Sequence, residues 1–298
     1  MKTLYAACRL CPRACGVNRL AGEKGACGAT ARLELSRAAL HLWEEPPLTG
    51  AKGSGTVFFT HCALGCVYCQ NRAISVRQAT GVPTDEVRLA QIFLELQAQG
   101  AQNVNLVTAG QYLPHVVLGI RRARADGLRI PVVYNCGGYE SPDALRLLDG
   151  LVQIYLPDLK YYSSYYAGMY SNAPDYFEVA DVAIGEMVRQ AGPVAFDSQG
   201  NMLRGVIIRH LMLPGLLGDT KQVLRHIAAH WGDRVQVSLM RQYTPTGMEG
   251  YPELDRTVTQ EEYDEAVQYF SDLGLCGYLQ DAETASESFI PSFLGEGI

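Results

Sequence analysis

The sequence lacks an excess of positive charge and lacks any long apolar run. Lys plus Arg total 25 against 31 Asp plus Glu, which gives a formal net charge of −6. Such a chain offers no general footprint for a nucleic-acid backbone, so we expect no nucleic-acid partner. No stretch approaches the roughly 20 apolar residues of a membrane span. The apolar segment at the start of the chain is too short for the hydrophobic core of a signal peptide. We therefore expect a cytoplasmic protein that does not bind a membrane.

The composition also lacks the marks of disorder and of repetitive sequence. Hydrophobic residues make up 48% of the 298 residues, which is enough to build a core. The 30 glycines and 17 tyrosines are scattered without a period, so collagen-like and low-complexity interpretations do not apply. The length fits one large α/β domain or two ordinary domains.

Cysteine is the residue type that is concentrated in one region. Seven of the nine cysteines lie within the first 69 residues, namely Cys8, Cys11, Cys15, Cys27, Cys62, Cys66 and Cys69. A reducing compartment disfavours disulfides, whereas thiolates spaced by two and three residues suit soft metals and iron-sulfur clusters. The pattern therefore predicts metal binding. Cys136 and Cys276 stand alone, and we expect Cys276 to lie in the core.

From residue 56 onward, short β-branched or aromatic runs alternate with longer amphipathic segments, a pattern typical of βα units and a parallel sheet. The predicted strands cover 56–59, 103–107, 130–134, 152–156, 206–211 and 235–239. The predicted helices lie near 84–99, 114–126, 142–149, 173–191, 220–231 and 259–273. Six such units in order favour a partial (β/α)6 TIM-like barrel, with a doubly wound sheet as the alternative.

The first 55 residues differ from the rest of the chain. They are rich in cysteine, glycine and proline, and we interpret residues 1–55 as a metal-bearing N-terminal extension. Residues 56–298 form the predicted barrel with a C-terminal extension. The segment 45–50, which contains two prolines and a glycine, is the predicted joint between the two parts.

Three cysteines follow the first predicted strand directly. The loop carries Cys62, Cys66 and Cys69 in a Cys-x3-Cys-x2-Cys pattern, with Gly65 allowing a compact turn. Three thiolates can hold a cubane [4Fe-4S] cluster and leave one iron open to an outside ligand. Zinc binding and a chance pattern are the weaker interpretations.

At this loop the sequence resembles the radical S-adenosylmethionine (SAM) superfamily, whose hallmark is this spacing with an aromatic residue, here Tyr68, before the third cysteine. Three further segments, 155–160, 208–215 and 239–245, are similar to pyruvate formate-lyase activating enzymes, especially to an uncharacterised activase-like branch. The resemblance spans roughly residues 56–250. It implies a cluster at the carboxyl ends of the barrel strands that binds SAM and cleaves it to a 5′-deoxyadenosyl radical, which abstracts a substrate hydrogen.

The resemblance also implies a set of cofactor-binding residues. The SAM carboxylate needs a cation, because a buried anion without a partner costs several kcal/mol, and Lys160 or Arg209 supplies it. The ordinary alternative for both is an ion pair with Asp158 at the strand ends. The family's Gly-Gly-Glu-Pro turn is replaced here by residues 107–112, so carbonyl groups and Thr108 must substitute for it. The complete predicted set is Tyr68, Thr108, Asn135, Asp158, Lys160 and Arg209.

Two groups near the predicted site keep more than one interpretation. Cys136 follows Asn135 at a strand end, where it packs, donates a hydrogen atom or binds a metal. After Lys160 the chain carries five tyrosines that pack, stack against a substrate or form a lid, at positions Tyr161, Tyr162, Tyr165, Tyr166 and Tyr170.

The four N-terminal cysteines form a second predicted site. Cys8, Cys11, Cys15 and Cys27 provide a closed set of four thiolates, which suits tetrahedral zinc or a fully ligated auxiliary [4Fe-4S] cluster. The spacing does not choose between the two metals. Three basic neighbours, Arg9, Arg13 and Arg19, would offset the thiolate charge.

Three functions follow from these sites. The leading one is a radical SAM enzyme, with an activase that installs a glycyl radical on a large partner as one role. The second is a radical SAM enzyme that modifies a peptide or small molecule. The third is a non-catalytic iron-sulfur or zinc protein, which would have no evident need for charged residues at the strand ends. The resemblance implies an electron donor such as flavodoxin or ferredoxin, and a glycyl radical enzyme or another protein as a candidate substrate.

Overall fold

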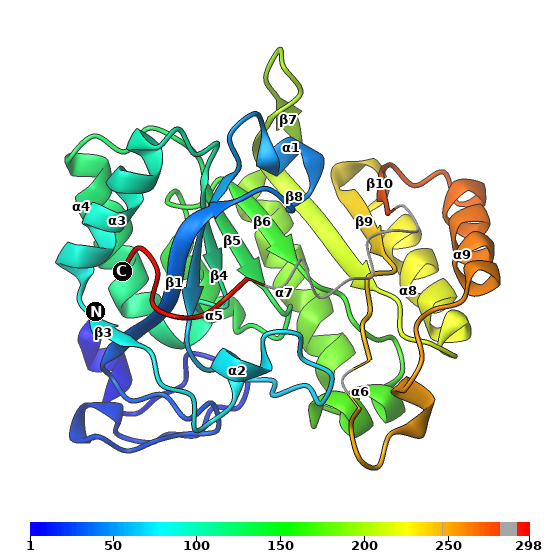
Figure 1. Cartoon of the computed structure of the whole chain (residues 1–298), viewed down its shortest axis with the longest axis horizontal. Coiled ribbons are helices and arrows are strands. Elements are labelled where there is room, and N and C mark those ends of the chain that lie inside the picture. The colour runs from blue at the N-terminus through cyan, green and yellow to red at the C-terminus, as the bar shows by residue number, and fades with distance from the viewer. Residues whose placement is uncertain (246, 281–290) are drawn as a thin grey trace.

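One large sheet dominates the computed structural model, which describes residues 1–245, 247–280 and 291–298 (Figure 1). Its strands lie in the order β10 (Gly277–Leu279), β9 (Gln236–Met240), β8 (Met202–Leu211), β6 (Ile154–Pro157), β5 (Val132–Cys136), β4 (Val104–Val107), β2 (Ser54–Phe59), β1 (Leu33–His41) and β3 (Val82–Thr84). The neighbours from β10 to β2 are parallel, while β1 is antiparallel to both β2 and β3. The short β7 (Ala195–Phe196) pairs with β8 alone.

Helices connect the parallel strands. The longer ones are α3 (Glu86–Ala98), α4 (Leu113–Ala125), α6 (Ser164–Ser171), α7 (Tyr176–Ala191), α8 (Leu217–His230) and α9 (Gln260–Asp272). The short ones are α1 (Pro46–Thr49), α2 (Arg72–Ser75) and α5 (Pro142–Leu145), and single 3-10 turns cover Lys2–Tyr5, Arg19–Ala21, Gly110–Tyr112, Arg146–Leu148, Gly232–Arg234 and Pro252–Leu254. Side-chain caps begin two of the predicted helices, because Asp85 accepts from the Val87 amide and Thr259 forms a capping box with Glu262.

The predicted α/β fold with a partial TIM-like barrel is confirmed. Each of the six predicted strands and six predicted helices is present within a few residues of its expected bounds. Within the described residues the sheet ends at β10 on one side and at β3 on the other, so it is an open sheet and not a closed barrel. This edge-to-edge order follows from right-handed βα crossovers that add each new strand beside the last.

Several elements escaped the sequence analysis because they are short or weakly patterned. Strand β1 lies within residues 1–55 and pairs with β2, with Leu35 opposite Phe59 and Ala39 opposite Thr56, so part of the predicted extension belongs to the sheet. The expectation that Cys276 lies in the core is wrong, since it is exposed just before the edge strand β10. No helix in the described part of the chain is long and apolar enough to cross a bilayer.

The two faces of the sheet carry different cores, as the alternation of strand side chains requires. The outer-facing residues, such as Leu106 and Ile208, join the main core with the helices. The inner-facing Val133, Ile154 and Ile207 form a separate cluster with Leu48 of α1. Helix α1 therefore closes the inner face near the start of the strands, and the carboxyl ends of the strands remain available for a site.

Candidate functional site

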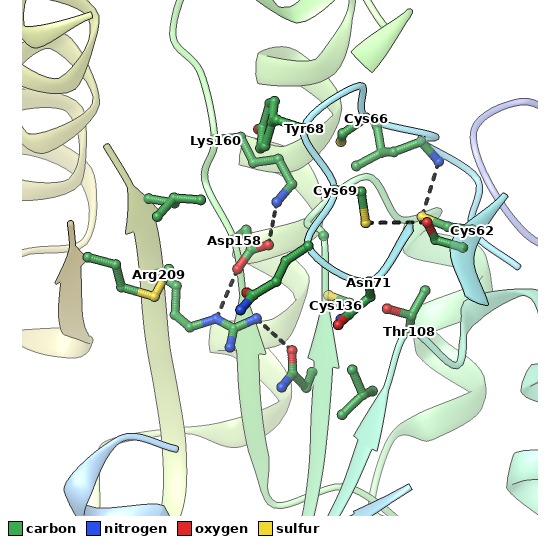
Figure 2. Close-up of a pocket in the computed structure, with 18 of the residues that line it drawn as sticks. Cys62, Cys66, Tyr68, Cys69, Asn71, Thr108, Cys136, Asp158, Lys160 and Arg209 are labelled. Carbon is green, nitrogen blue, oxygen red and sulfur yellow. Dashed lines mark hydrogen bonds and ion pairs between the residues drawn. The ribbon is translucent and has the colours of Figure 1, made fainter. Parts of the chain in front are cut away.

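A cavity of about 260 Å³ lies on the inner face at the carboxyl ends of the parallel strands (Figure 2). The loop between β2 and α2 forms one wall of it with Cys62, Cys66 and Cys69. The strand ends form the wall that faces this loop, with Asn135, Asp158, Lys160 and Arg209. The tertiary structure thus brings the predicted cluster loop and the predicted charged residues to one cavity, which is where parallel α/β folds place their chemistry.

The three thiols of the loop are buried or half-buried, and each has a donor nearby. Ser171 Oγ donates to Cys66 Sγ at 2.9 Å, Ser75 Oγ lies 3.3 Å from Cys69 Sγ, and the Leu64 amide lies 3.4 Å from Cys62 Sγ. Burial raises the pKa of Cys62 to about 12, and the neighbouring Cys66 and Cys69 add to the increase. Three adjacent thiolates therefore need a strong cationic partner to ionise together.

The donor set fits an iron-sulfur cluster, since soft thiolates from one compact loop are its usual ligands. Among the residues described, no group of three His, Cys, Asp or Glu side chains is arranged closely enough to hold a single metal ion. The thiols point instead to the serine hydroxyls and the amide, which are the partners at hand.

Asp158 is the centre of the charged wall. Its Oδ2 lies 2.6 Å from Lys160 Nζ, and its Oδ1 lies 2.9 Å from Arg209 Nε. Arg209 also donates from Nη2 to Asn135 Oδ1 at 2.7 Å. Burial alone would raise the pKa of Asp158, but the charges of Arg209 and Lys160 outweigh it and hold this pKa below its usual value. The Asp158 carboxylate thus pairs with two cations, so Asp158, Lys160 and Arg209 together carry one positive charge.

Tyr68 is fixed in the cavity wall by a chain of hydroxyl groups. Tyr161 donates to Tyr68 at 2.6 Å and lies 2.8 Å from Ser171, which in turn contacts Cys66. The ring of Tyr243 packs edge-on against Tyr68. Of the tyrosines after Lys160, Tyr161 and Tyr170 are buried and pack here, whereas Tyr162 and Tyr165 are exposed.

Thr108 follows the end of β4 in a left-handed conformation, with φ at 58°, which is rare for a β-branched residue. Its amide donates to the Asn135 carbonyl at 2.8 Å. Its own carbonyl accepts from Gln111 Nε2 at 2.8 Å, and this same nitrogen reaches the carbonyls of Thr60 at 2.7 Å and His61 at 3.0 Å. Gln111 therefore ties the ends of β2 and β4 together, a role that no local pattern revealed.

Glu44 is the second residue that the sequence analysis missed. It lines the cavity from the segment before α1, and its side chain is only 8% exposed. Its Oε2 lies 3.9 Å from Arg209 Nη1. The sequence presented it only as a neighbour of a proline-rich joint, and a glutamate pair before two prolines carries no signal for burial.

The N-terminal cysteine segment packs against the cluster loop. Arg13, which lies between Cys11 and Cys15, donates to the carbonyls of Ala63 at 3.1 Å and Asn172 at 2.6 Å. Cys11 and Cys62 line one small cavity of about 20 Å³. Of the four N-terminal thiols, Cys8 and Cys27 are buried, Cys11 is half-buried and Cys15 is exposed.

Arg19 is a buried cation next to these thiols. Its side chain donates to the carbonyls of Gln111 at 2.7 Å and Thr30 at 2.6 Å, and its Nη1 lies 3.6 Å from Cys8 Sγ. It also stacks over the Tyr5 ring at 4.5 Å. Within the described residues Arg19 forms no ion pair with a carboxylate, and Cys8 Sγ is the sulfur atom that its guanidinium contacts.

We compared the sequence and the structure with those of known proteins. No protein-family model matches the chain. An uncharacterised protein from Methanocaldococcus jannaschii is 28% identical over 274 residues, which cover 90% of this chain and 75% of that protein.

Two solved structures share the architecture at low sequence identity. A radical SAM methyltransferase from Sphaerobacter thermophilus superposes with a TM-score of 0.55 at 13% identity, covering 80% of this chain and 70% of that one. Streptococcus suis SuiB bound to S-adenosylmethionine gives a TM-score of 0.52 at 12% identity, covering 76% of this chain and 52% of that one. The chain therefore has the fold of radical SAM enzymes.

Proposed function

We propose that this protein is a radical SAM enzyme. The observation that carries the proposal is that Cys62, Cys66 and Cys69 line the same cavity as Asp158, Lys160 and Arg209. A [4Fe-4S] cluster on the three thiolates would supply the electron that cleaves the sulfonium of SAM into methionine and a 5′-deoxyadenosyl radical, which takes a hydrogen atom from a substrate. An electron carrier or a zinc-binding module would gain nothing from the charged wall.

The chain's own residues would bind and orient the cofactor. The wall around Asp158 has one excess positive charge, which matches the carboxylate of SAM, and Arg209 is held in a fixed orientation to receive it. The Asn135 side chain on β5, two strands away from β8 in the sheet, accepts a hydrogen bond from the Arg209 guanidinium and positions it. Tyr68 would close the site beside the loop, and the carbonyls near Thr108 would accept hydrogen bonds from the cofactor's amino group.

The cavity of about 260 Å³ favours a small molecule or a single peptide side chain as the substrate. Leu48 and the inner-facing strand residues pack together at the start of the strands, on the side that we call the floor. An activase acting on a glycine loop needs an open lateral entrance, and we place that role second.

We also propose that the four N-terminal cysteines bind a second metal, either zinc or iron in an iron-sulfur cluster. The buried Arg19 beside Cys8 supports an anionic thiolate site, because a guanidinium without a carboxylate partner is costly to bury. The packing of Arg13 against Ala63 supports a role in fixing the cluster loop. A small flavoprotein or iron-sulfur protein, such as flavodoxin or ferredoxin, would donate the electron.

The test is a triple Cys62→Ala, Cys66→Ala, Cys69→Ala variant, reconstituted anaerobically with iron and sulfide. We expect it to lose one four-iron cluster and to form no 5′-deoxyadenosine from SAM and dithionite. The matched control is Cys276→Ala, which removes an exposed thiol far from the loop in sequence and should leave both properties unchanged. A triple variant that keeps its full iron content and its 5′-deoxyadenosine yield would show that the proposed function is wrong.

A further inference from the structure

The cavity ends on an acidic residue that the cofactor chemistry does not use. Glu44 reaches the cavity from the segment before α1, while the cysteine loop reaches it from the carboxyl end of β2. Trp43 and His41 line the cavity from the same segment. An occupant that extends from the cluster loop toward the floor therefore meets the Glu44 carboxyl group.

Polar atoms without partners lie beside Glu44. Asn105 of β4 is fully buried, and neither its Oδ1 nor its Nδ2 has a hydrogen-bond partner among the residues that the structure describes. It shares the inner face of β4 with Val107, which lines the cavity two residues further along the strand. Glu45 Oε2 is likewise buried without a partner. These two buried groups lie behind the cavity wall, and Glu44 is the acidic residue that lines the cavity at this end.

The charges along the cavity leave Glu44 without a full counter-ion. Arg209 is already engaged by Asp158 at 2.9 Å and by Asn135 at 2.7 Å, and its nearest contact with Glu44 is 3.9 Å. A SAM carboxylate bound at this wall would compete with Glu44 for Arg209. The contact at 3.9 Å is the ion pair that the described residues give Glu44, so a cationic group of the substrate would offer it a closer partner.

We propose that Glu44 recognises a cationic, hydrogen-donating group of the substrate, such as a primary ammonium or a guanidinium. The inference rests on the proposed function, because it assumes that the substrate occupies the same cavity as SAM. It narrows the substrate class to amine-bearing or guanidine-bearing compounds, including Lys or Arg side chains of a peptide.

The experiment uses three probes of equal chain length: n-butylammonium, n-butanol and butyrate. Binding of each to the full-length, anaerobically purified protein is followed by ligand-observed NMR titration in the presence of excess SAM. We expect saturable binding of n-butylammonium only, and an affinity at least 10-fold weaker in Glu44→Gln, because a charge-assisted hydrogen bond is lost. Glu44→Asp retains the charge, and its affinity for n-butylammonium should lie between those of the wild type and Glu44→Gln. Glu95→Gln removes an exposed carboxylate on α3 and should bind the probe like the wild type.

Two results would overturn the inference. One is equal binding of n-butylammonium by the wild type and a correctly folded Glu44→Gln variant. The other is a loss of SAM affinity in Glu44→Gln with unchanged probe binding, which would make Glu44 a positioning residue for Arg209. The proposed function is tested separately. If the protein binds n-butylammonium through Glu44 but does not cleave SAM, the cation site at Glu44 stands and the assignment as a radical SAM enzyme is wrong.

Discussion

Arg209 and Asp158 are joined through both their backbones and their side chains. Their backbones form an isolated parallel bridge between Arg209 in β8 and Asp158, which directly follows β6, and Arg209 Nε lies 2.9 Å from Asp158 Oδ1. The opposite oxygen of the same carboxylate holds Lys160. The two cations are therefore oriented before any ligand arrives, which reduces the entropy lost on binding an anion between them.

Arg209→Ala is expected to weaken SAM binding roughly 10- to 150-fold, because removing a charge-assisted hydrogen bond costs about 1.5 to 3 kcal/mol. Equilibrium dialysis with labelled SAM measures the effect, and iron analysis serves as the control because cluster content should not change. Arg209→Lys should recover part of the affinity. Wild-type affinity in both Arg209→Ala and Lys160→Ala would leave these residues as a structural ion pair with Asp158.

The double variant Cys11→Ser, Cys15→Ser is expected to lose one metal equivalent and to unfold at a lower temperature, since a structural metal site contributes folding free energy directly. Metal analysis of the wild type decides between zinc and iron. Cys276→Ser is the control for losing an exposed thiol. A wild type that contains a single four-iron cluster and no zinc would rule out the second site.

Gln111→Met is expected to lower the free energy of unfolding by about 1 to 3 kcal/mol, because the carbonyls of Thr60, His61 and Thr108 lose their shared donor in a buried position. Urea titration measures the change. SAM affinity should fall with it, since Thr108 and the cluster loop both move when the strand ends separate. A variant with wild-type stability and wild-type SAM affinity would remove Gln111 from the site.

Binding of n-butylammonium is expected to strengthen about 10-fold from pH 6 to pH 8. Burial and the neighbouring Glu45 raise the pKa of Glu44 to about 7, against the lowering effect of Arg209. Asp158 also faces Glu44 and raises this pKa. A carboxyl group with that pKa is about 10% ionised at pH 6 and about 90% ionised at pH 8, while the probe stays cationic throughout. The Glu44→Gln variant should show no such slope, and a slope of the opposite sign would contradict the assignment.

The sequence by itself determined where the six parallel strands lie along the chain and where the three-cysteine loop follows the first of them. Both are local signals: β-branched runs at regular intervals predict parallel strands, and Cys62, Cys66 and Cys69 lie close together in the chain whatever the rest does. The ends of parallel strands meet at one edge, so the placement of Asp158, Lys160 and Arg209 near the loop also followed from the pattern.

Only the tertiary structure decided how these residues share their charges and what lies beneath them. Three features show this: Asp158 pairs with two cations, Gln111 bonds to the ends of two strands, and Glu44 lines the cavity near Arg209. Each feature depends on contacts between residues from different segments of the chain. Strand β1 escaped prediction because its pairing with β2 is a long-range contact. Local propensity does not record such contacts, since the packing of α1 under the sheet is what carries Glu44 to its place.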